Sequence, residues 1–123
     1  MVLVDLSAPI QAAHVALLEP WQCVRLWLMA GWLYERRDVE LIDDDTWHAL
    51  CERIRLDRVK MVEANGAEKY IPFDDLETGS AMALNSNLPR LRSIYGALHL
   101  YEKWYGKKLP GLSETEFSEA CRN

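Results

Sequence analysis

Cysteine is scarce in this chain of 123 residues, and no long hydrophobic run is present. The three cysteines, Cys23, Cys51 and Cys121, form no Cys-x-x-Cys pair and are too few for a disulfide framework. We expect reduced core thiols at Cys23 and Cys51, which lie in apolar patterns, and an exposed thiol at Cys121. The longest apolar run covers residues 26–34 and is well short of the ~18 residues that cross a bilayer. The first ten residues lack the basic start of a signal peptide, so the expected location is the cytoplasm.

Positive charge is in deficit, with 14 Lys and Arg against 19 Asp and Glu, which gives a net charge of -5. Nucleic-acid affinity comes largely from basic side chains that neutralise phosphates. The arginines at 36–37 and 53–58 alternate with acids, as on an ordinary charged helix face. The sequence therefore predicts neither direct nucleic-acid binding nor membrane binding.

Sequence motifs of catalysis are absent. The chain contains no His-Glu-x-x-His, no Gly-x-Ser-x-Gly, no P-loop and no Gly-x-Gly-x-x-Gly, and His14, His48 and His99 are widely scattered. Oxygens of the Asp43–Asp45 run could hold a cation, but a helix cap explains these acids better. We expect no metal site and no enzymatic activity.

Apolar residues recur at helical spacing over most of the chain, which predicts a mostly α fold. Residues 21–36 are apolar nearly all round, as in a helix at the centre of a core. Residues 67–86 lack this periodicity and predict an irregular central loop. We expect one compact helical domain over residues 1–123, with four to five helices. Their expected ranges are 7–18, 21–36, from the Asp43–Asp45 run to Asn65-Gly66, from Asn87 to Gly106, and 113–121.

Residues 33–50, LYERRDVELIDDDTWHAL, form the most informative segment. The segment resembles the N-terminal helical subdomain of NAD-dependent DNA ligases, in which one helix ends in a tyrosine pair and a second begins with Asp-x-x-Tyr-Asp-x-Leu. Tyr34 matches the first tyrosine, Asp44 the aspartate, Trp47 the aromatic residue and Leu50 the leucine. The resemblance implies a pocket for nicotinamide mononucleotide, with the aromatic ring on the nicotinamide and the acids on ribose hydroxyls.

Two departures from the ligase pattern concern single residues, and a third concerns a whole domain. Glu35 stands where ligases have Tyr or His, and His48 replaces the aspartate after the aromatic residue. No lysine of the chain is followed by x-Asp-Gly, so the nucleophile of the adenylation domain is missing. Because this nucleophile is missing, we expect that the chain does not ligate DNA.

The small ligase-related proteins of tailed phages are a closer match, because they retain only this helical part. They carry a second segment, Asp-Asp-Leu-x-x-Gly-Thr-Gly, which is similar to residues 74–80 here. Together the two similar stretches span residues 21–100. The resemblance implies a phage protein in the host cytoplasm.

Three functional hypotheses follow. The first is a non-catalytic phage-type protein that binds and modulates a host or phage protein of replication or host defence, as an inhibitor for example. The second is a module that binds nicotinamide mononucleotide or NAD, and the third is a structural virion component or homo-oligomer. Trp47 also fits the core, Asp44 a helix cap and His48 a solvated position. The candidate binding residues are Tyr34, Asp44, Trp47, His48, Asp74 and Asp75.

Overall fold

The computed structural model describes residues 7–57, 59–61 and 91–122, and this part of the chain is mostly helical, as predicted. The expected central loop, the Asn65-Gly66 helix end and the expected helix start at Asn87 lie outside the described residues. None of the described helices has both the length and the apolar character needed to cross a bilayer. The described elements are a 3-10 helix η1 (Ala12–Leu17) and the α-helices α1 (Pro20–Arg37), α2 (Asp44–Leu56), α5 (Leu91–Tyr105) and α6 (Glu114–Cys121).

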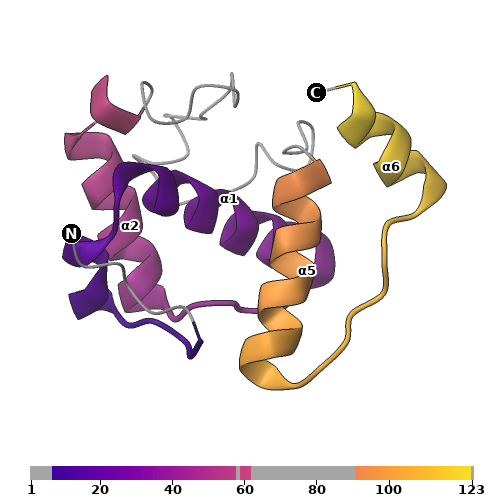
Figure 1. Cartoon of the computed structure of the whole chain (residues 1–123), viewed down its shortest axis with the longest axis horizontal. Helices are drawn as coiled ribbons and strands as arrows, with labels where there is room; N and C mark the ends of the chain where they lie inside the picture. The colour runs from indigo at the N-terminus through magenta and orange to yellow at the C-terminus, as the bar shows by residue number, and fades with distance from the viewer. Residues whose placement is uncertain (1–6, 58, 62–90, 123) are drawn as a thin grey trace.

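Helix α1 runs across the middle of the molecule, with η1 and α2 at one end and α5 across the other (Figure 1). Pro20 opens α1, where the missing N–H of proline costs nothing, and the backbone N–H of Glu19 donates to the side chain of Gln22. Every residue from 22 to 33 except Arg25 is buried. The prediction of a central, all-round buried helix is confirmed, although Trp21 at its start is half exposed.

The first helix differs from its prediction in both extent and type. We expected a helix over residues 7–18, and the structure shows a 3-10 helix over Ala12–Leu17. Its tight turn is closed locally, because the N–H of Gln11 donates to the ring of His14 while the N–H of His14 donates to the Gln11 carbonyl. Arg53 of α2 then binds the Val15 carbonyl at 2.8 Å, which ties η1 to α2.

The cap of α2 is Asp43, and this corrects the expectation that placed a cap at Asp44. The Asp43 carboxylate accepts from the backbone N–H of Thr46 at 2.8 Å and from its hydroxyl at 2.6 Å. Asp44 is the first residue of the helix and is exposed. These two bonds hold the pKa of Asp43 below its ordinary value.

Helix α2 ends earlier than expected. The predicted third helix continued to Asn65-Gly66, whereas α2 ends at Leu56 with Asp57 as its C-cap. The N–H of Asp57 donates to the Arg53 carbonyl, and its carboxylate accepts from the Arg53 side chain at 3.0 Å. Helical backbone resumes over residues 59–61.

Helix α5 ends as predicted at Gly106, which has a φ of 69° and suits the left-handed stop position. The helical spacing of the apolar residues predicts Tyr95 on the buried face, but Tyr95 is half exposed while Ser93 and Ala97 are buried. Close approach to α1 explains the difference, since a Cβ atom on Gly96 would lie 3.2 Å from the sulfur of Met29. Small side chains therefore face α1, and Tyr95 turns outward.

Helix α6 begins where it was predicted, after its N-cap Ser113, and its start is a capping box. The Ser113 hydroxyl accepts from the N–H of Glu116, and the Glu116 carboxylate accepts from the N–H of Ser113, both at 3.2 Å. Residues 107–113 connect α5 to α6 without helix or strand, and α6 lies on the side of α5 opposite to α2 (Figure 1).

Candidate functional site

The ligase-like residues lie on a helix–loop–helix formed by the end of α1, residues 38–43 and the start of α2. Tyr34 is 56% exposed on the last turns of α1, and Asp44 is exposed at the first position of α2. His48 is exposed, as expected for a solvated side chain. Asp74 and Asp75 lie outside the described residues.

Trp47 is half-buried and packs in the core. Its ring stacks on the fully buried ring of Trp27, with centroids 5.4 Å apart and planes inclined by 18°. The indole N–H of Trp27 also donates to the sulfur of Cys51 at 3.3 Å. One face of Trp47 is thus covered by α1. Tyr34 lies seven residues beyond Trp27, about 10 Å further along the helix axis.

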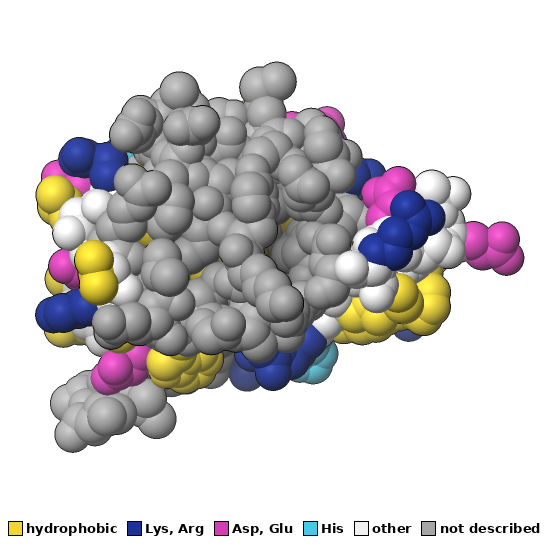
Figure 2. Space-filling model, turned by 90° about the horizontal axis from the view of Figure 1, so that it is seen from above, with side chains coloured by type: hydrophobic (Ala, Val, Ile, Leu, Met, Phe, Trp, Pro, Cys, Tyr) yellow, Lys and Arg dark blue, Asp and Glu magenta, His cyan; other side chains and the backbone are white. Residues whose placement is uncertain are grey.

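A groove between α5 and α6 is a second candidate, which the sequence analysis did not identify. It has a volume of about 410 Å³ and is open to solvent. Tyr95 is 48% exposed and Phe117 46% exposed. Figure 2 shows hydrophobic side chains gathered at the α6 end of the molecule, bordered by charged ones. The groove is lined by Tyr95, Leu112, Ser113, Glu114, Phe117 and Ser118.

The sequence contains one signal of this groove. Phe117 is the only aromatic residue in the polar stretch from Ser113 to Asn123. No apolar stripe at helical spacing surrounds it, so the sequence does not predict that its ring lies in the core. Tyr95 carries no such signal, because its spacing fits the predicted apolar face of the α5 helix. Only the packing of α5 on α1 places it in the groove.

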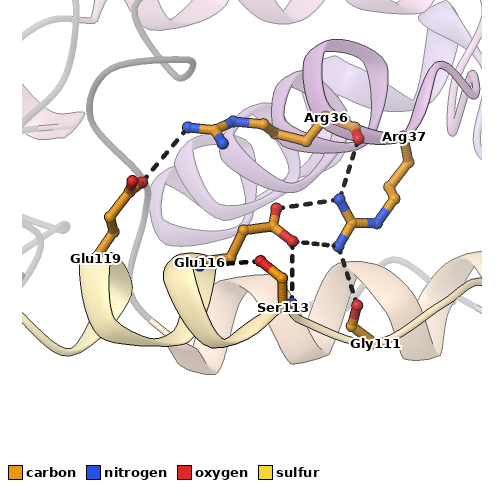
Figure 3. A network of polar contacts seen from close by, with 6 residues as sticks. All are labelled: Arg36, Arg37, Gly111, Ser113, Glu116 and Glu119. Carbon is orange, nitrogen blue, oxygen red and sulfur yellow. Dashed lines mark hydrogen bonds and ion pairs between the residues drawn. The ribbon is translucent and has the colours of Figure 1, made fainter.

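An ion pair between α1 and α6 fixes one wall of the groove. The two terminal nitrogens of Arg37 donate to the two carboxylate oxygens of Glu116, at 3.1 and 2.9 Å (Figure 3). Each of these side chains is 13% exposed. Donation from Arg37 lowers the pKa of Glu116, so the carboxylate is charged at neutral pH.

The guanidinium of Arg37 is held from three further directions. It lies over the ring of Trp32, 4.7 Å from the centroid, and donates to the carbonyls of Arg36 and Gly111 at 3.0 and 3.2 Å. Arg36 itself approaches Glu119 at 3.8 Å. The arginines at 36–37 therefore bind α6 rather than forming only a solvated charged face.

Burial raises the pKa of two further groups, the Cys23 thiol and the Tyr105 hydroxyl. Burial raises the pKa of Cys23 to about 11, so its thiol is protonated at neutral pH. Burial also raises the pKa of Tyr105, whose hydroxyl donates to the Leu41 carbonyl at 2.7 Å. Cys23, Cys51 and Cys121 are free thiols, the first two buried and the third exposed, as predicted. Within the described ranges, no three His, Cys, Asp or Glu side chains gather as a metal site would require.

Comparisons with known proteins give no relative for this chain. No family model matches its sequence, and no curated protein and no solved structure is significantly similar to it.

Proposed function

We propose that the chain is a non-catalytic interaction protein that binds a segment of a host or phage protein in the groove between α5 and α6. The groove carries this proposal because Tyr95 and Phe117 present half-exposed rings around one hollow. Aromatic rings beside a concave surface are the typical anchors of protein–protein interfaces.

The charge of the groove indicates the chemistry of the partner. Glu114 is the one charged residue among the described residues that line the groove, and the whole chain carries a net charge of -5. A complementary partner segment presents a large apolar side chain next to Lys or Arg. Such basic segments are common in proteins that act on nucleic acids, in agreement with a modulator of replication or defence proteins.

The helix–loop–helix over residues 33–50 supports the phage-type part of the proposal. The resemblance to small ligase-related phage proteins requires two helices joined by an acidic loop, and α1, residues 38–43 and α2 have this arrangement. The proposal accordingly places the protein in the host cytoplasm as a binder, and an inhibitor of its partner.

Titration with short peptides tests the groove directly. A peptide with a central Phe flanked by lysines is added to the 15N-labelled protein, and a peptide flanked by glutamates serves as the control. We expect amide shifts confined to α5 and residues 112–118, at concentrations several-fold lower for the lysine peptide. Shifts elsewhere, equal binding of both peptides or no binding would overturn the proposal.

Two serine substitutions make this test specific. Phe117→Ser removes an anchor of the groove, whereas Tyr34→Ser removes a ring on α1 that is slightly more exposed. We expect peptide binding to be lost in the first variant and retained in the second. Light scattering, which measures the mass of the particle in solution, tests the homo-oligomer hypothesis. A dimer that Phe117→Ser dissociates would assign the groove to a second copy of the chain and overturn binding of a foreign segment.

The nicotinamide mononucleotide hypothesis is the second candidate, favoured by the same helix–loop–helix. Tyr34 and Asp44 are exposed and available to a ligand, while Trp47 offers only the face turned away from Trp27. Calorimetric titration with nicotinamide mononucleotide and with NAD tests it, using Tyr34→Ala and Asp44→Asn because neither side chain belongs to the core. Binding that both substitutions weaken supports this candidate, and the absence of heat at millimolar ligand rejects it.

A further inference from the structure

Helix α6 contributes little apolar surface to the core. Of its eight residues only Ala120 is buried, and Phe117 is half exposed. Burial of a single small side chain stabilises a helix only slightly, and a helix of this length is marginal in isolation. Apart from the partly buried Leu112, which packs against the core just before α6, some other interaction must therefore keep α6 in place.

The Arg37–Glu116 pair supplies that interaction. It is bidentate, mostly buried and joined by the bond from Arg37 to the Gly111 carbonyl, on the connection before α6 (Figure 3). Charge-assisted paired bonds of this geometry are among the strongest polar contacts in proteins. The second contact, between Arg36 and Glu119, is longer at 3.8 Å and more exposed, so it adds little.

The half of the pair on α1 does not depend on α6. Arg37 rests on the buried ring of Trp32 and donates to the carbonyl of Arg36, and all three residues belong to α1. The receptor for the carboxylate thus remains formed when α6 moves away. Re-closure then needs only the return of Glu116.

We infer that α6 is a latch closed by the Arg37–Glu116 pair, which opens while α1, α2 and α5 stay folded, and which assembles the binding groove only when closed. The link to binding rests on the function proposed above, because α6 carries Glu114 and Phe117. Opening separates these residues from Tyr95 on α5. A partner that needs both walls therefore binds only the closed form, and its affinity is reduced by the fraction of open molecules.

Hydrogen exchange of the full-length protein, resolved by residue, tests the latch. Glu116→Gln keeps the shape of the side chain but removes its charge, and Glu119→Gln makes the same change in the exposed pair. We expect exchange of α6 amides to accelerate by about tenfold or more in Glu116→Gln, since bonds to charged groups contribute that much, with α1 and α5 unchanged. Glu119→Gln should change α6 exchange by less than about threefold.

Several outcomes would overturn the latch. In one, α6 exchange is the same in Glu116→Gln as in the unsubstituted protein. In another, α1 and α5 lose protection together with α6, because α6 then unfolds only with the core. If Glu116→Gln fails to fold, exchange of the unsubstituted protein in rising urea decides the question. A latch exposes α6 amides at lower urea than α1 amides.

The lysine-flanked peptide separates the latch from the proposed function. Faster α6 exchange without peptide binding to any variant would leave the latch standing and reject the groove. Slower α6 exchange in the presence of peptide, and weaker binding to Glu116→Gln, are expected if both hold. If the peptide binds Glu116→Gln and the unsubstituted protein with equal affinity, although α6 exchanges faster in the variant, the link between latch and groove is broken.

Discussion

Helices α1 and α6 meet at the last turn of α1, yet different forces hold them in the fold. Helix α1 is buried over nearly its whole circumference between residues 22 and 33, and its stability comes from apolar burial. Helix α6 buries only Ala120 and depends on the ion pair between Glu116 and Arg37. The comparison teaches that a small fold can combine a rigid element with one whose position depends mainly on one mostly buried ion pair.

The largest expected effect concerns the apolar side of this comparison. Trp27 on α1 is fully buried, stacks on Trp47 and donates to Cys51. Trp27→Ala leaves a cavity and should lower the free energy of unfolding by about 3–5 kcal/mol in urea titrations. Trp21→Ala is the matched control, because this half-exposed ring lies on the same helix. We expect a change within about 0.5 kcal/mol for it, and similar losses for both would contradict the role of burial.

A smaller effect is expected from the charged side of the comparison. Arg37→Met should destabilise by about 2 kcal/mol, because it removes the two charged donors of the mostly buried Glu116 carboxylate and leaves only the Ser113 N–H. A double-mutant cycle of Arg37→Met with Glu116→Gln should show coupling of about 1–2 kcal/mol. The same cycle at Arg36 and Glu119 should give less than about 0.5 kcal/mol. Equal coupling in the two pairs would show that geometry and burial do not distinguish them.

The contact between α5 and α1 can be tested at Gly96. An added Cβ atom would meet the sulfur of Met29 at 3.2 Å and the guanidinium of Arg25 at 3.3 Å, and both atoms belong to long side chains with several rotatable bonds. Gly96→Ala should therefore gain up to about 1 kcal/mol from helix propensity. Gly96→Leu should lose about 1–2 kcal/mol through overpacking. Thermal unfolding of both variants measures the effect, and equal stability would show that α5 does not lie close to α1 here.

Acid should weaken α6 before it weakens α1. The pKa of Glu116 is lower in the fold than in the unfolded chain, so its contribution is complete above the ordinary value of 4.5. The contribution disappears as the pH falls through the lowered pKa. Thermal midpoints between pH 6 and pH 3 should therefore fall less steeply for Glu116→Gln than for the unsubstituted protein. Asp43 contributes a decline of the same sign to both proteins, so only the difference reports on Glu116.

The last prediction concerns the reactivity of the three cysteine thiols and involves no change in stability. Cys23 lies in α1 and is buried with its pKa raised to about 11, whereas Cys121 ends α6 and is exposed. Iodoacetamide should alkylate Cys121 in the native protein, and Cys23 and Cys51 only after unfolding. Mass spectrometry of the time course shows the order. Early modification of Cys23 would contradict the rigidity assigned to α1.

Much of the fold was predictable because local signals specify helix ends. Asp43 before α2, Gly106 after α5 and the Ser113 capping box each act on backbone groups only a few residues away. The α1 core followed from its continuous apolar pattern. The early end of α2 at Leu56 was missed, because apolar residues continue at helical spacing beyond it, as far as Met61.

The sequence by itself determined a mostly α protein with a buried central helix, because periodicity and capping depend on neighbouring residues. Only the tertiary structure decided which face of α5 is buried and how α6 is held, since Arg37 and Glu116 are 79 residues apart. The groove exists for the same reason. Its walls, Tyr95 and Phe117, belong to different helices, and their distance is set by the packing of α5 on α1 and by one ion pair.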